Sequence, residues 1–202
     1  GVPPKTDFEV LQSTIDRVLE ASSSSGPIEG LVDPERIAAT GESSGAGAAY
    51  GLASADPRVD AFIAYSVGFG GALGPAPAVP DKPGMVMAAS DDGIIQASLT
   101  EEVFDAMASP KYLVEVADAG HAVFTDLCLM GGDGPHNLVD RLPTWQVAPD
   151  FMVQASQDGC EDDRAPVTEA FPAINHLGVA FLRSELGIDP EPVGLDTAAV
   201  AD

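Results

Sequence analysis

Basic residues are scarce in this sequence. Its 202 residues include 9 Lys and Arg against 32 Asp and Glu, and the formal net charge is -23. A surface of this charge repels phosphate backbones and anionic lipid headgroups, so nucleic acids and membrane surfaces are not expected partners. An anionic substrate is disfavoured for the same reason, whereas a neutral substrate is not.

Long apolar runs are also lacking, and no segment reaches the length needed to cross a membrane. The chain is nevertheless long enough to form one domain with a sizeable core. Residues 1–188 carry the patterns of folded structure, and residues 189–202 form an acidic tail that contains proline. Within the folded part, residues 122–163 show little periodicity and predict an irregular excursion.

Cysteine is rare, with only Cys128 and Cys160 in the whole chain. An even pair is compatible with one disulfide or with two free thiols. We predict the disulfide, which would close a loop of about 32 residues and stabilise the fold by about 3 to 4 kcal/mol. Such a bridge implies a secreted or extracytoplasmic protein, and free thiols would instead imply a cytoplasmic one.

Apolar residues alternate between strand-like and helix-like spacing along the chain. Strands are expected at 37–40, 59–66, 85–89 and 111–116, and helices from the capping box at Thr6 to about residue 21, after Ser43, from Thr100, and at 174–186. This alternation predicts an α/β fold, with a mainly parallel sheet and helices on both faces.

A G-x-S-x-G sequence, Gly41-Glu42-Ser43-Ser44-Gly45, stands between the first expected strand and the helix that follows it. On such a strand-to-helix turn a serine projects its hydroxyl above the sheet, and flanking glycines let the chain bend sharply. Ser43 is therefore a candidate nucleophile, and the backbone N–H of Ser44 is a candidate oxyanion donor. The alternative is a glycine-rich turn that only packs a helix on the sheet.

An acid and a histidine follow two later strands. Reactive groups collect at the carboxyl ends of parallel strands, which is where Asp91-Asp92 and His121 are expected. Asp92 is the candidate acid, with Asp91 as the alternative, and His121 is the candidate base. His136 and His176 are weaker candidates for the base, because they lie in the irregular excursion and in the last helix.

The segments at 41–45, 90–95 (Ser-Asp-Asp-Gly-Ile-Ile) and 119–124 (Ala-Gly-His-Ala-Val-Phe) resemble the three triad segments of serine α/β-hydrolases. The resemblance is closest to the dienelactone-hydrolase-like and polyester-hydrolase branch, which includes cutinase-like and platelet-activating-factor-acetylhydrolase-like enzymes. It implies an α/β-hydrolase fold and a Ser43-His121-Asp92 triad that cleaves carboxylic esters through an acyl-enzyme, without metal or cofactor.

The sequence departs from this family at two places. Dienelactone hydrolases use a cysteine nucleophile where this chain has Ser43, which indicates ester substrates, either small neutral esters or polyesters. The family also has several strands before the nucleophile strand, together with a loop that donates the second oxyanion N–H. The resemblance therefore implies that residues 1–188 are the C-terminal part of a hydrolase domain and need the N-terminal part. The alternative function is a catalytically silent fragment that serves as a binding or scaffold element.

Several other residues carry weaker hypotheses. Phe69 and Phe124 are candidates for an apolar substrate pocket, although ordinary core packing explains them equally well. Asp133 and Asp140 lack the spacing of metal ligands and are interpreted as solvated loop charges, so no metal site is expected. Trp145 has no assigned role.

Overall fold

A four-stranded parallel sheet organises the structure, a computed structural model that describes residues 7–130 and 150–195. Its strands are β1 (Ile37–Glu42), β2 (Val59–Tyr65), β3 (Gly84–Ala89) and β4 (Lys111–Val116). They lie side by side in chain order, and each neighbouring pair is parallel. All the strands therefore end at the same edge of the sheet. The expected α/β architecture with a parallel sheet is confirmed.

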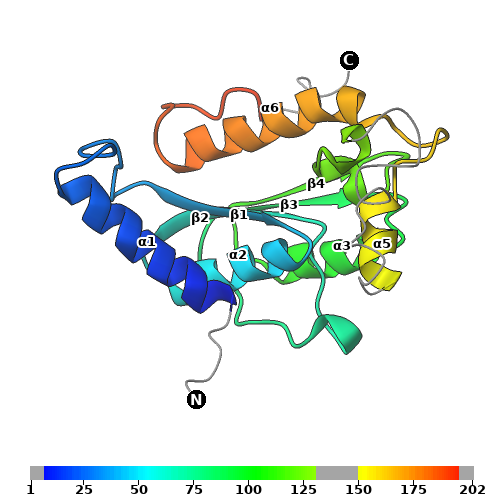
Figure 1. The fold of residues 1–202 in the computed structure, drawn as a ribbon, viewed down its shortest axis with the longest axis horizontal. Coiled ribbons are helices and arrows are strands. Elements are labelled where there is room, and N and C mark those ends of the chain that lie inside the picture. The colour runs from blue at the N-terminus through cyan, green and yellow to red at the C-terminus, as the bar shows by residue number, and fades with distance from the viewer. Residues whose placement is uncertain (1–6, 131–149, 196–202) are drawn as a thin grey trace.

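Helices cover both faces of this sheet (Figure 1). The helices α1 (Asp7–Ser23), α2 (Ser44–Ala55) and α3 (Ala97–Ala106) lie on one face, and α6 (Val167–Glu185) lies on the other. The α2 helix is rich in alanine and glycine, so its backbone can approach the strands closely. Its inward-facing Ala46, Ala49 and Ala53 are all buried.

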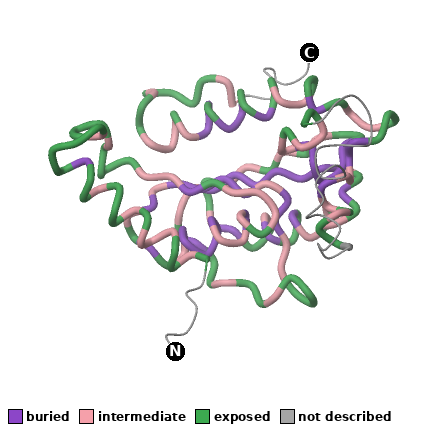
Figure 2. The backbone as a smooth tube through the Cα atoms, viewed as in Figure 1, coloured by how far each residue is buried: buried purple, intermediate pink, exposed green. Residues whose placement is uncertain are grey.

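Two apolar cores fill the space between these layers. One joins α2 to the sheet, with Phe8, Leu11 and Ile15 of α1 packed against it, and the other joins α6 to the opposite face of the sheet. Burial is concentrated in the central strands and on the helix faces that point toward them (Figure 2). Because β2 and β3 are covered on both faces, they read as nearly continuous apolar runs. Such runs made these strands easy to predict from the sequence.

The stretch from 122 to 163 contains more regular structure than expected. It holds part of the 3-10 turn η2 (His121–Phe124), the turn η3 (Leu127–Leu129) and the helix α5 (Asp150–Gln157). The expectation of a wholly irregular excursion is corrected there, because an eight-residue helix is too short to show a clear helical period. The Gly-rich run at 131–135 lies outside the described residues.

The two ends of the chain are described only in part. Thr6, the expected helix cap, lies outside the described residues, and so do residues 196–202 of the acidic tail. The last helix begins at Val167, earlier than the apolar face that starts at Ile174. Among the described helices, none has the combination of length and apolarity that spanning a membrane requires.

Candidate active site

Ser43 occupies a strained turn between β1 and α2. Its backbone angles are φ 53° and ψ -117°, a region that L-residues rarely adopt and that costs about 1 to 3 kcal/mol. The turn is held by neighbouring backbone, since Ser43 N donates to Tyr65 O at 3.0 Å. Ser44 is the first residue of α2, so its N–H has no partner within the helix and is available to an oxyanion.

The two glycines of the motif play different parts in this turn. A Cβ on Gly41 would lie 2.1 Å from the carbonyl oxygen of Gly45, which is too close for any side chain. A Cβ on Gly45 would meet no atom within 4 Å. The two flanking glycines are therefore not equivalent, because only Gly41 is required sterically.

Asp92 is a buried carboxylate with a full set of hydrogen-bond donors. Its Oδ1 accepts from the N–H groups of Ile94 and Ile95 at 2.8 and 2.7 Å. Its Oδ2 accepts from the Ser66 hydroxyl at 2.8 Å and lies 2.8 Å from His121 Nδ1. Four partners on two oxygens hold this side chain in a single orientation.

His121 lies between two carboxylates. Its Nδ1 faces Asp92, and its Nε2 lies 3.2 Å from Glu42 Oε1. The imidazole side chain is only 3% exposed, whereas that of Glu42 is 29% exposed. The ring is therefore oriented at both nitrogen atoms, and Nε2 points toward the turn that carries Ser43.

Burial and mutual electrostatic interactions together shift the pKa values of His121, Asp92 and Glu42. Burial lowers the pKa of His121, but the hydrogen bond and charge of Asp92, then the charges of Glu42 and Asp158, outweigh it and raise the pKa. Burial raises the pKa of Asp92, yet its hydrogen bond to His121 and its other favourable contacts bring the pKa below the usual value. Burial keeps the pKa of Glu42 raised in spite of the His121 charge. The arrangement favours a charged imidazole beside an ionised Asp92.

A cleft of about 300 Å³ opens beside these groups. Glu42, Ser43, Ser44 and His121 line one side of it. The remaining lining residues come from the region of η2 and η3 and from α5, and they are Ala122, Thr125, Leu127, Phe151, Met152, Ala155 and Ser156. Ser43 and His121 thus face the same space, although within the described structure the recorded partners of the His121 ring are Asp92 and Glu42.

Phe69 and Phe124 lie elsewhere. Phe69 packs against the α2 core, with its ring centroid 5.3 Å from that of Tyr50. Phe124 packs against the α6 core, with its ring centroid 5.4 Å from that of Tyr65. Neither lines the cleft beside Ser43. The hypothesis that they form the substrate pocket is corrected in favour of core packing on the two faces of the sheet.

Two of the alternative candidates, Asp91 and His176, have partners outside this site. Asp91 points away from His121 and pairs with Arg164 at the surface, where its side chain is 43% exposed. His176 lies on α6, and its Nε2 is 3.2 Å from Gly194 O. His136 lies outside the described residues, as do Asp133, Asp140 and Trp145. No group of three potential metal ligands occurs within residues 7–130 and 150–195.

Three polar residues of the site were not singled out from the sequence. Glu42 is the first of the two variable residues of the G-x-S-x-G motif. Ser66 follows β2 directly, so the position of Ser66 at a strand end was a usable signal. Asp158 follows α5, and its Oδ2 accepts from the N–H groups of His121 and Gly93 at 2.6 and 3.0 Å. Nothing in the local sequence marks Asp158.

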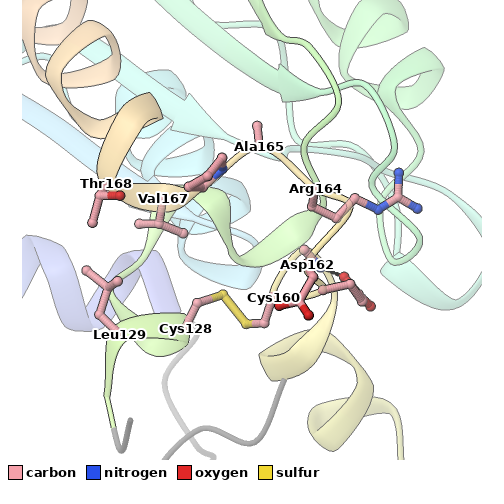
Figure 3. A pocket seen from close by; sticks show the side chains of 11 residues that line it. Cys128, Leu129, Cys160, Asp162, Arg164, Ala165, Val167 and Thr168 are labelled. Carbon is pink, nitrogen blue, oxygen red and sulfur yellow. Dashed lines mark hydrogen bonds between the residues drawn. A yellow bond between two sulfur atoms is a disulfide. The ribbon is translucent and has the colours of Figure 1, made fainter. Parts of the chain in front are cut away.

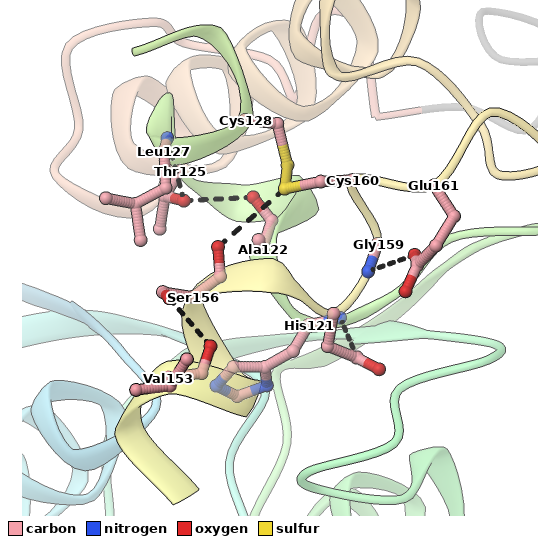
Figure 4. The surroundings of a disulfide bond; sticks show 11 residues. His121, Ala122, Thr125, Leu127, Cys128, Val153, Ser156, Gly159, Cys160 and Glu161 are labelled. Atoms are coloured by element: carbon pink, nitrogen blue, oxygen red, sulfur yellow. Dashed lines mark hydrogen bonds between the residues drawn. A yellow bond between two sulfur atoms is a disulfide. The ribbon is translucent and has the colours of Figure 1, made fainter. Parts of the chain in front are cut away.

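The predicted disulfide is present. Cys128 in η3 and Cys160 just beyond α5 are bonded, with their Cα atoms 5.2 Å apart (Figure 4). Another cavity, of about 220 Å³, lies beside this bond, and Leu129, Arg164 and Val167 are among its lining residues (Figure 3). The disulfide therefore connects the segment after His121 to the segment after α5.

Comparisons with known proteins support the fold. No protein-family model matches the sequence, and no curated protein matches it. A solved ferulic acid esterase from Streptomyces cinnamoneus is similar in structure, with a TM-score of 0.58 and 22% sequence identity. The similarity covers 98% of this chain and 55% of the esterase, so this chain spans about half of that protein's length. At this level of identity the similarity establishes the fold: the chain has an α/β architecture of the type found in esterases.

Proposed function

We propose that this chain carries the catalytic centre of a serine hydrolase that cleaves carboxylic esters. The observation that carries the proposal is the position of His121. Its Nδ1 is hydrogen-bonded to the buried carboxylate of Asp92, and it lines the same cleft as Ser43, which lies on a strained turn. The ferulic acid esterase with a similar fold supports an ester as the substrate class.

The mechanism follows from the roles that these groups can take. His121, oriented by Asp92, accepts the Ser43 proton as the hydroxyl oxygen attacks the ester carbonyl carbon. The Ser44 N–H, at the start of α2, stabilises the negative charge that develops on the carbonyl oxygen. His121 then returns the proton to the leaving alcohol, and an activated water releases the acid from Ser43 in the second half of the cycle.

The cleft and the surface charge support a neutral substrate with an apolar group. Leu127, Phe151 and Met152 place apolar side chains on the wall of the cleft, and the chain carries a net charge of -23. A neutral ester with an aromatic or aliphatic acyl or alcohol group fits this setting. The disulfide supports a secreted or extracytoplasmic location, where such bonds persist.

A fluorophosphonate probe tests the proposal directly. In protein expressed from its complete coding sequence, the probe should label Ser43, and Ser43→Ala should abolish both labelling and the cleavage of p-nitrophenyl butyrate. Methyl ferulate and short p-nitrophenyl esters make a suitable first panel. Full-rate labelling of Ser43→Ala would remove the nucleophile assignment.

A catalytically silent binding or scaffold element is the competing proposal. It is favoured by β1, which pairs only with β2 among the described strands, and by the recorded contact of His121 Nε2 with Glu42. A wild-type protein that binds esters without turnover and without labelling would support it.

A further inference from the structure

Asp158 connects the two loops that carry the candidate acid and the candidate base. Its Oδ2 atom accepts two backbone hydrogen bonds, from His121 N at 2.6 Å and from Gly93 N at 3.0 Å. Gly93 follows Asp92 directly. One carboxylate oxygen therefore bridges the backbone of one triad candidate and the backbone beside the other.

The main chain around Asp158 is fixed against the same loop. Its carbonyl oxygen accepts from Ala122 N at 2.8 Å, and its own N–H donates to Gln154 O at 2.9 Å, at the end of α5. The next residue, Gly159, is in direct backbone contact with Gly120, since a Cβ on Gly120 would lie 2.5 Å from the Cα of Gly159. These contacts leave the carboxylate little freedom to move away from His121.

The disulfide anchors this segment from the other side. Cys160 is two residues beyond Asp158 and is bonded to Cys128, in the turn that follows His121 (Figure 4). Gly159, between Asp158 and Cys160, donates its N–H to Glu161 Oε2 at 2.9 Å, and this hydrogen bond shapes the short connection from Asp158 to the disulfide. Asp158 is thus held by α5 on one side and by a covalent bond on the other.

The distance between the two loops matters for the chemistry. The His121 Nδ1 to Asp92 Oδ2 contact, at 2.8 Å, joins side chains from two separate strand ends. Another hydrogen bond between these loops, from Asp91 N to Ala119 O at 2.9 Å, joins residues that precede Asp92 and His121 in the sequence, whereas Asp158 bonds the N–H of His121 itself. Displacing a reacting group by about 1 Å can reduce turnover by about 10²-fold.

We propose that Asp158 is a positioning residue that holds the His121 and Asp92 loops at the separation which catalysis needs. The inference rests on the proposed esterase function. Asp158 itself does not contact the substrate or the reacting atoms. It acts through the backbone N–H groups of His121 and Gly93, so the positioning role needs an acceptor oxygen at the right place. The negative charge of Asp158 has a separate effect, which is to raise the pKa of His121.

Substitutions that separate oxygen position from charge test this role. Asp158→Asn keeps an acceptor oxygen at the same reach and removes the charge, so kcat for p-nitrophenyl butyrate should stay within about fivefold of wild type. Asp158→Glu keeps the charge but moves the oxygen by one methylene, and Asp158→Ala removes the acceptor. We expect kcat to fall by about tenfold or more for Asp158→Glu and by about 10²-fold for Asp158→Ala, with KM within about threefold.

Asp163→Asn is the matched control, because it removes the same charge from an exposed position in the same segment and should leave kcat unchanged. The proposal is overturned if Asp158→Glu is as active as wild type, or if Asp158→Asn is as impaired as Asp158→Glu. This pair decides the question even where Asp158→Ala does not fold.

Fluorophosphonate labelling separates the esterase proposal from the positioning proposal. Labelling of wild-type Ser43 together with normal kcat in Asp158→Glu overturns only the positioning role. Absence of labelling in the wild type removes the esterase function and the role of Asp158 with it.

Discussion

Glu42 Oε1 lies 3.2 Å from His121 Nε2, the ring nitrogen that faces the cleft. A carboxylate at this place favours the protonated imidazole, and it stands next to the candidate nucleophile in the sequence. The contact links the first variable residue of the G-x-S-x-G turn to the ionisation of His121, the candidate base. It also makes Glu42 a competitor of Ser43 for the same nitrogen atom in the absence of substrate.

The first prediction concerns the pH dependence of Glu42→Gln. His121 must be neutral to accept a proton, and its pKa is raised, after the opposing effect of burial, by Asp92 and then by Glu42 and Asp158. The acidic limb of kcat/KM in the wild type should therefore lie above pH 6.5, the usual pKa of histidine. Removing the Glu42 charge lowers the pKa of His121, so the limb should move to lower pH. Glu101→Gln, on the exposed side of α3, is the control and should leave the limb in place. An unchanged limb in Glu42→Gln would contradict the electrostatic role.

The second prediction separates the adjacent aspartates. Asp92→Asn replaces the carboxylate that faces His121 Nδ1 and should lower kcat by about 10⁴, as in serine proteases. Asp91→Asn breaks a surface ion pair with Arg164, which is worth about 0 to 1 kcal/mol, and should change kcat by less than about threefold. Steady-state kinetics on one ester compares the two variants. A larger loss in Asp91→Asn than in Asp92→Asn would reverse the assignment.

The third prediction compares the two glycines of the G-x-S-x-G turn. Gly41→Ala would bring a methyl group to 2.1 Å from Gly45 O, and we expect it to lower the free energy of unfolding by about 3 kcal/mol or to prevent folding. Gly45→Ala places its methyl group in open space within α2, and it should raise stability by about 0.5 to 1 kcal/mol. Urea unfolding curves of the two variants give the comparison. Equal destabilisation by both would show that the turn is not packed as described.

The fourth prediction concerns the disulfide. Reduction, or the double substitution Cys128→Ser with Cys160→Ser, should lower the free energy of unfolding by about 3 to 4 kcal/mol, because the bond spans a sequence separation of 32 residues. Urea titrations with and without dithiothreitol measure the difference. The double variant serves as the control, since its stability should not respond to the reductant. Two alkylatable thiols in the unreduced wild-type protein would show that the bond is absent in solution.

Much of the fold could be predicted from local patterns. The buried strands β2 and β3 are apolar along their whole length, and α1 carries an amphipathic period, so their types and places follow from the sequence. Helix α5 was missed because its eight residues are fewer than a reliable period needs. The sequence also could not predict that Phe69 and Phe124 lie on opposite faces of the sheet, because this depends on how each loop crosses the sheet.

The sequence by itself determined which residues can meet. Ser43, Asp92 and His121 each follow an expected strand, and the carboxyl ends of parallel strands lie along one edge of the sheet, so the sequence predicts these residues at that edge. Only the tertiary structure decided the contacts within that edge. Adjacent residues such as Asp91 and Asp92 point in different directions. Asp158 reaches the site from the end of α5, and the sequence around Asp158 does not predict where that helix lies. Those contacts depend on angles between distant segments, which arise when the whole chain packs.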